Sequence, residues 1–116
     1  MPTSSGIEVI ALEEHYWDKV VTNTFVGRNA SRRGPLLDRL YDVGELRLKE
    51  MDAAGIDIQV LSHGAPSAQR LDAETGPGIA RQANDNLHAT VLANPDRFAA
   101  FAALATAHPE SAADEL

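Results

Sequence analysis

The chain has 116 residues, no cysteine and a formal net charge of −7 at pH 7. Its shares of hydrophobic residues (44%) and charged residues (23%) are those of an ordinary folded domain. The negative charge opposes attraction to nucleic-acid phosphates or anionic lipid, and an aromatic share of 5% argues against a base-stacking surface. We therefore expect neither a nucleic-acid nor a membrane partner, and any bound metal must be held by histidine and carboxylate.

The first twelve residues do not resemble a signal peptide. They have no basic start, they carry Glu8 inside an apolar run, and they lack a small-residue cleavage pattern. No window of the chain approaches the ~18 apolar residues of a membrane-spanning helix. We therefore expect the protein to be cytoplasmic.

The first expected element is a strand over residues 7–15, because a short apolar run bounded by polar residues is typical of a buried strand. A long loop without clear periodicity follows over residues 16–35. Apolar residues then recur at helical spacing over residues 36–54 and predict a helix that ends at Gly55, with Gly44 as a point of interruption.

The second half of the chain repeats this order. It predicts a strand over residues 56–62, a helix over residues 77–94, a strand over residues 98–105 and the start of a helix over residues 109–116. Strands that alternate with helices predict right-handed crossovers and a parallel sheet covered by helices. Both a (β/α) barrel and an open doubly wound sheet satisfy this pattern.

The first predicted strand ends with two residues of types that commonly bind metal ions. Residues two apart on a strand point to the same side, so Glu13 and His15 converge while Glu14 faces away. A carboxylate oxygen and an imidazole nitrogen at the C-terminal end of a barrel strand suit Zn²⁺ or Mn²⁺. Without a metal role, Glu13 and His15 would simply be two polar residues where a strand meets solvent.

Five segments carry a resemblance to a known family. They are residues 11–16 (ALEEHY), 47–57 (RLKEMDAAGID), 60–66 (VLSHGAP), 83–85 (AND) and 94–104 (NPDRFAAFAAL). In order and spacing, over residues 7–116, they resemble the start of an amidohydrolase-related protein. The similarity is to the decarboxylase branch that includes γ-resorcylate, 2,3-dihydroxybenzoate and aminocarboxymuconate semialdehyde decarboxylases.

The resemblance implies that residues 1–116 form one incomplete domain, the N-terminal part, about three β/α units, of a TIM-type (β/α)8 barrel. It implies one divalent ion, Zn²⁺ or Mn²⁺, with Glu13 and His15 as ligands, and further His and Asp residues beyond Leu116, the Asp as general acid. The implied activity is a metal-dependent carboxy-lyase that decarboxylates a hydroxylated aromatic or related carboxylic acid. This branch also implies a homo-oligomer.

Two alternatives stay open. The chain has Leu104-Ala105-Thr106 where the family commonly has Leu-Pro, and His63-Gly64 where related sequences often have Asn or another small polar residue. A metal-dependent hydrolase of the same superfamily is therefore the alternative reaction. The other alternative is a short, non-catalytic interaction module or a gene remnant, because we expect the segment alone to be inactive and three barrel strands to leave two open sheet edges.

Several residues near the ends of the first two strands are expected to line the substrate pocket. The predicted substrate contacts are Trp17, Phe25, Ser62, His63 and Pro66. The loop that follows the first strand is a candidate lid, with Arg28, Arg32 or Arg33 attracting a carboxylate. Several of these residues also have a purely structural interpretation. Trp17 could pack on the barrel wall, Pro66 could only make its turn rigid, His63 could be an ordinary loop histidine, and the arginines could be solvated. His88 is expected at the surface, and His108 lies just past the third strand.

Overall fold

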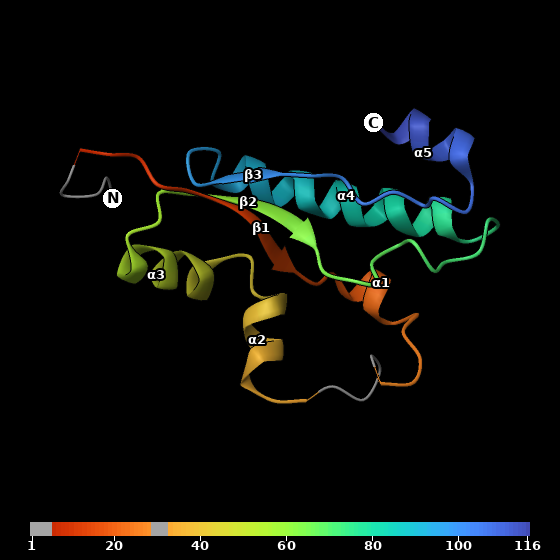
Figure 1. Ribbon diagram of the computed structural model, residues 1–116, viewed down its shortest axis with the longest axis horizontal. Helices are drawn as coiled ribbons and strands as arrows, with labels where there is room; N and C mark the ends of the chain where they lie inside the picture. The colour runs from red at the N-terminus through yellow and green to blue at the C-terminus, as the bar shows by residue number, and fades with distance from the viewer. Residues whose placement is uncertain (1–5, 29–32) are drawn as a thin grey trace.

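The computed structural model describes residues 6–28 and 33–116. These residues form one parallel sheet in the order β1-β2-β3, with the strands β1 (Ile10–Tyr16), β2 (Ile58–His63) and β3 (Phe98–Ala100). The helices in the described residues are α1 (Lys19–Thr22), α2 (Pro35–Tyr41), α3 (Glu45–Ala54), α4 (Gly76–Ala93) and α5 (Pro109–Glu115) (Figure 1). The predicted α/β class with a parallel sheet is confirmed. None of these helices is long and apolar enough to span a membrane.

The segment between the first two strands differs from the sequence prediction. The expected loop contains the short helix α1, because the Asp18 carboxylate accepts a hydrogen bond from the Val20 backbone N–H at 2.8 Å and caps it. The expected single helix over residues 36–54 is two helices, α2 and α3. The Asp42 carboxylate breaks it by accepting from the backbone N–H groups of Gly44 (2.9 Å) and Arg47 (3.1 Å).

The third strand is shorter than the expected range of residues 98–105. Strand pairing ends at Ala100, and the backbone of Ala103 bonds instead to the side chain of Asn84 on α4. Asn84 Nδ2 donates to Ala103 O and Asn84 Oδ1 accepts from Ala103 N, both at 2.8 Å. This side chain takes the place of a neighbouring strand.

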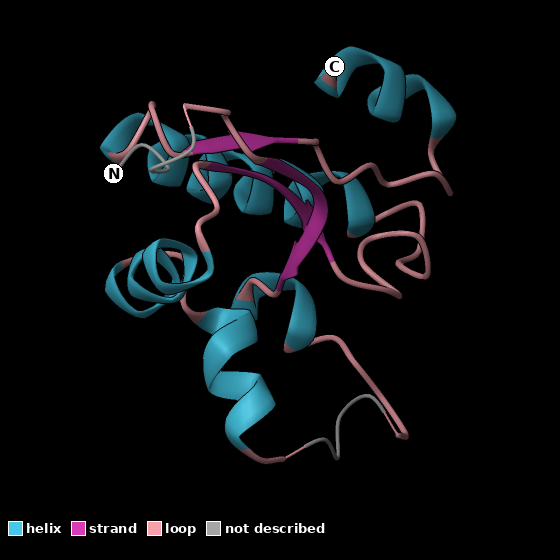
Figure 2. Ribbon diagram, turned by 60° about the vertical axis from the view of Figure 1, so that its left-hand side comes forward, coloured by secondary structure: helices cyan, strands magenta, loops and turns pink. Residues whose placement is uncertain are grey.

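The helices cover one face of the curved sheet (Figure 2). Strand residues that point to this face form the core with Met51 of α3 and Leu87 of α4; they are Tyr16, Leu61 and Phe98. Helix α4 runs antiparallel beside the strands (Figure 1), as a β/α crossover requires. The buried face therefore holds the sheet and helices together.

The opposite face of the sheet has no covering element among the described residues. Its apolar side chains are well exposed, with Ile10 at 50%, Leu12 at 65% and Phe101 at 55%. Ile58 and Val60 of β2 lie on the same face and are partly exposed. We refer to this surface, defined by Ile10, Leu12, Ile58, Val60 and Phe101, as the open face.

A β-bulge interrupts β1 at the candidate metal ligands. Ala11 pairs with Gln59 and Glu14 pairs with Leu61, so Leu12 and Glu13 together oppose a single residue of β2. Glu13 takes a left-handed backbone conformation with φ of 57°. For a residue with a side chain this conformation costs about 1 kcal/mol, and such strain concentrates at functional sites.

Candidate metal centre

Glu13, the middle residue of β1, and His15, its second-last residue, are both exposed. His15 pairs with Ser62 of β2, on the strand side that carries the open face, and its Nδ1 lies 3.0 Å from Ser62 Oγ. In residues 6–28 and 33–116, no three His, Asp or Glu side chains gather closely enough to hold a metal ion. The described chain thus exposes two possible donors on β1, a carboxylate and an imidazole.

Glu14 lies on the other side of the strand, beside the helices. It pairs with the buried Leu61 and lines a cavity of about 300 Å³ between β1, α2 and α3. Burial lowers the pKa of Arg47 in this cavity, and the nearby charge of Glu14 opposes that shift. The two adjacent glutamates therefore have different surroundings. Glu13 is exposed, whereas Glu14 lies beside the partly buried guanidinium of Arg47.

Arg47 ties the end of β1 to the helices. Its guanidinium donates to Asp42 O (2.7 Å), Arg39 O (2.9 Å), Gln59 Oε1 (3.1 Å) and His15 O (3.1 Å). The planar guanidinium carries five N–H donors on three nitrogens, whereas a lysine carries three donors on a single nitrogen and cannot reach acceptors spread this widely. Sequence reasoning assigned Arg47 to the family motif without a role. The structure shows that it holds the backbone of the candidate ligand His15.

His63 lies at the end of β2 with 9% of its surface exposed. Its Nε2 accepts from the Asp18 backbone N–H at 2.9 Å, and its Nδ1 donates to Gly64 O at 2.9 Å. These bonds define the neutral tautomer that carries hydrogen on Nδ1. Burial lowers the pKa of His63, against the effect of both backbone bonds. In this neutral state the ring of His63 bridges the segment after β1, at Asp18, and the segment after β2, at Gly64. A contact of His63 with substrate stays a prediction.

Trp17 is packed inside the protein, with 4% of its surface exposed. Its ring meets Phe25 edge to face at 5.2 Å and Tyr41 at 6.1 Å between centroids. Gly64 is required here because a Cβ at that position would lie 2.7 Å from Trp17 Nε1. Trp17 and Phe25 therefore hold the junction of α1, α2 and β2. Their predicted contact with substrate is not tested by this arrangement.

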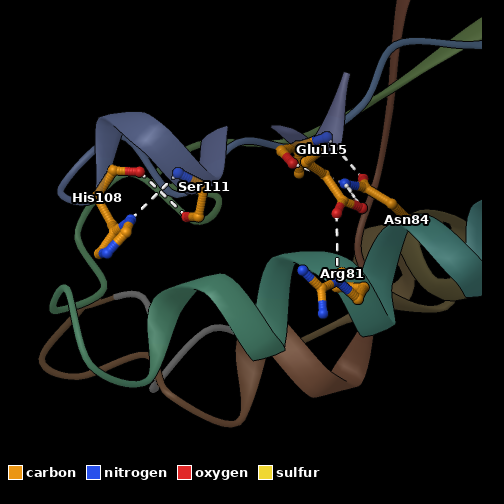
Figure 3. Close-up of polar contacts among 6 residues, drawn as sticks. Arg81, Asn84, His108, Ser111 and Glu115 are labelled. Carbon is orange, nitrogen blue, oxygen red and sulfur yellow. Dashed lines mark hydrogen bonds and ion pairs between the residues drawn. The ribbon is translucent and has the colours of Figure 1, made fainter. Parts of the chain in front are cut away.

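The remaining predicted residues have varied surroundings. Ser62 is half-buried and contacts His15, whereas Pro66 is half-buried in the turn after β2. Arg28 and Arg33 are exposed, and Arg32 lies outside the described residues. His88 is exposed on α4. His108 caps α5 by accepting at Nδ1 from the Ser111 backbone N–H at 3.2 Å (Figure 3).

Two polar residues that sequence reasoning left without a role connect the elements around the site. The Asp18 carboxylate accepts from Asn86 Nδ2 at 2.8 Å, which joins α1 to α4. Asn84 also donates to Glu115 Oε1 at 3.1 Å, which joins α4 to α5 (Figure 3). An Asp just before a short helical turn is a capping signal in the sequence, whereas the contact of Asn84 with Ala103 has no local signal.

A buried hydroxyl lies beneath the candidate site. Among the described residues, Tyr16 Oη is buried without a hydrogen-bond partner. Tyr16 lines a cavity of about 200 Å³, and Asp18 and Asn86 line the same cavity. Burial raises the pKa of Tyr16, and the charge of Asp18 raises it further, so the phenol stays protonated at neutral pH.

Comparisons with known proteins give the context of this geometry. No family model matches the chain. The γ-resorcylate decarboxylase of Rhizobium sp. (strain MTP-10005) is 40% identical over 112 residues, which cover 92% of this chain and 33% of the relative. The chain is similar in sequence to γ-resorcylate decarboxylases and to the decarboxylase orsB of Emericella nidulans. It spans about a third of the length of these curated relatives.

Solved structures agree with this similarity. A dihydroxybenzoic acid decarboxylase of Polaromonas sp. JS666, with bound manganese and the inhibitor 2-nitroresorcinol, matches with a TM-score of 0.79 and 36% identity. The match covers 93% of this chain and 33% of that one. A 5-carboxyvanillate decarboxylase of Novosphingobium aromaticivorans, with manganese and a nitrobenzoic acid, gives a TM-score of 0.84 at 30% identity, over 98% of this chain and 39% of that one.

Proposed function

We propose that this chain supplies the first-strand part of a divalent-metal site in a carboxy-lyase that decarboxylates hydroxylated aromatic acids. The observation that carries the proposal is that Glu13 and His15 are both exposed in the C-terminal half of β1. It is supported by 36% identity to a decarboxylase solved with manganese. The left-handed conformation of Glu13 adds support, because strain of this kind concentrates at functional sites.

The two side chains fit a divalent ion by their chemistry. Glu13 offers carboxylate oxygens, and His15 offers Nε2, because its Nδ1 is already in contact with Ser62. Oxygen and imidazole donors suit Mn²⁺ and Zn²⁺. When bound, the ion would supply a Lewis acid that orients the substrate carboxylate and phenolic oxygen. Glu13 and His15 would hold it, and we expect the other ligands and the general acid in other parts of the protein.

The proposal also places the sheet in a barrel. We infer that β1, β2 and β3 are three neighbouring strands of a TIM-type (β/α)8 barrel, with the open face turned inward. The parallel order β1-β2-β3, the helices on one face and the likeness to solved decarboxylases support this placement. The exposed apolar side chains of the open face support it as well, because a barrel interior would bury them.

Product analysis tests the reaction. The protein is incubated with Mn²⁺ and 2,6-dihydroxybenzoate, and CO₂ and resorcinol are measured together. We expect one CO₂ and one resorcinol for each substrate consumed, and a loss of about 100-fold or more in turnover for Glu13→Ala and His15→Ala. Glu14→Gln, which alters the opposite side of the strand, is the matched control and should keep most of the activity.

Two results would count against this function. Substrate turnover without CO₂ release, or activity confined to lactone or amide substrates, would favour the hydrolase alternative. Wild-type turnover in both Glu13→Ala and His15→Ala would remove these residues from the site.

A further inference from the structure

The ring of His15 contacts the neighbouring strand through Ser62. Its Nδ1 lies 3.0 Å from Ser62 Oγ and 3.4 Å from Ser62 O. A backbone carbonyl only accepts hydrogen bonds, so hydrogen on Nδ1 satisfies both oxygens, whereas a bare Nδ1 would face the lone pairs of the carbonyl. The geometry therefore favours the tautomer that leaves the lone pair on Nε2.

The strand register fixes this contact. His15 and Ser62 are directly paired residues of the β1–β2 ladder, just after the bulge. Side chains of such pairs on one face of a sheet lie close enough to interact. The backbone of His15 is held as well, because Arg47 Nη2 donates to His15 O at 3.1 Å. The main chain and the ring of His15 are thus restrained from different directions.

We propose that Ser62 is a positioning residue for His15: its backbone carbonyl sets the tautomer and its hydroxyl sets the orientation of the ring, so that Nε2 is available to a divalent cation. A histidine ligand generally binds metal through one nitrogen while the other donates to a fixed acceptor, and that second bond orients the ring. This inference rests on the proposed function for its metal and assigns a role to Ser62 different from the substrate contact expected from the sequence.

The first test measures the tautomer in the metal-free protein. Nitrogen NMR of ¹⁵N-labelled imidazoles at about pH 8, where histidine is neutral, distinguishes hydrogen on Nδ1 from hydrogen on Nε2. We expect His15 to carry hydrogen on Nδ1 in the wild type. Ser62→Ala and Ser62→Thr both keep the backbone carbonyl of residue 62, so hydrogen should stay on Nδ1 in both variants.

The second test measures affinity for Mn²⁺ alone and for Zn²⁺ alone by calorimetric titration. Ser62→Ala should weaken binding by about 10-fold or more, which is the usual effect of losing the partner of a histidine ligand, and Ser62→Thr should recover most of it. Val60→Ala is the matched control, because Val60 lies two residues earlier on the same face of β2 without a hydrogen bond to His15. It should leave both readouts unchanged.

The two tests separate this inference from the proposed function. Hydrogen on Nε2 of His15 in the wild type, or wild-type metal affinity in Ser62→Ala, would overturn the role of Ser62, while metal binding itself would still support the proposed function. A wild-type protein that binds neither ion would overturn the metal site and with it the purpose proposed for Ser62. Hydrogen on Nδ1 of His15 together with weaker metal binding in Ser62→Ala supports both.

Discussion

At the scale of single residues, His63 couples folding to protonation. Its ring is buried, with one nitrogen donating to Gly64 O and the other accepting from the backbone of Asp18. A protonated ring would have to donate from both nitrogens, yet Nε2 faces a backbone N–H, which is itself a donor. The neutral form is therefore the one that the folded structure accommodates.

We predict that the free energy of unfolding falls as pH drops below about 6.5. Burial lowers the pKa of His63 from 6.5 in the folded state, so the unfolded chain takes up the proton first. The contribution of neutral His63 to the free energy of unfolding is therefore fully present above about pH 6.5. It is lost as the pH falls through the lower pKa of the folded state. Urea unfolding between about pH 7 and pH 5 measures this slope.

The matched variants are His63→Gln and His88→Gln. The first removes the buried imidazole and should flatten the slope, whereas the second alters an exposed histidine of α4 and should keep it. Equal slopes in all three proteins would contradict the assignment.

Residue patterns predicted the pair of candidate ligands but not their local geometry. Alternation along a strand predicts that Glu13 and His15 share one side of β1 and that Glu14 faces away; the structure places Glu14 beside the helices, and the role of Glu13 and His15 stays a prediction. The bulge and the left-handed backbone of Glu13 have no signal in that pattern, because alternation assumes regular pairing with β2. The burial of Trp17 and His63 was also out of reach, because it depends on the short helix α1, which an aperiodic sequence hides.

At the scale of elements, one side chain of α3 hydrogen-bonds to both β1 and β2. Arg47 reaches the backbone of β1, the buried Gln59 of β2 and two carbonyls around α2. The break between α2 and α3 is what brings its guanidinium to these acceptors. The sequence marked Gly44 as a point of interruption, but the capping by Asp42 that produces the break appears only in the structure.

We predict that Arg47→Lys destabilises the protein by about 2 kcal/mol or more. Lysine keeps the charge but lacks the fork that reaches four acceptors, and the partly buried Asp42 O and Gln59 Oε1 would lose a donor. Urea unfolding measures the change in free energy.

Arg39→Lys is the control for charge and side-chain length. Arg39 pairs with Glu50 at 2.9 Å on an exposed surface, and its loss should cost below about 0.5 kcal/mol. A loss in Arg47→Lys no larger than in Arg39→Lys would show that the Arg47 contacts do not hold α3.

At the scale of the whole molecule, the open face is an apolar sheet surface that no element among the described residues covers. A parallel sheet covered by helices followed from the alternation of strands and helices in the sequence, and the structure confirms it. The choice between a closed barrel and an open sheet did not follow, because both use the same repeating unit. The exposed apolar residues on the uncovered face favour the barrel.

We predict that residues 1–116 expressed alone bind an apolar fluorescent dye and self-associate in sedimentation experiments. Contiguous exposed apolar surface and unpaired strand edges both favour association. Leu12→Lys combined with Phe101→Glu, both on the open face, should reduce dye binding and association. Leu92→Glu changes an equally exposed residue on α4, at 64% exposure, and should leave both unchanged. A monomeric segment without dye binding would contradict the open-face argument.

The most direct measurement for the central claim is a titration of the metal-free protein with Mn²⁺, comparing wild type, Glu13→Gln, His15→Asn and Glu14→Gln. Removing one ligand should weaken binding by about 100-fold or more in the first two variants, because each loses a donor atom that the ion needs. Glu14→Gln should bind as the wild type does, because Glu14 points toward the helices. Equal affinity in Glu13→Gln, His15→Asn and the wild type would contradict a metal site at the end of β1.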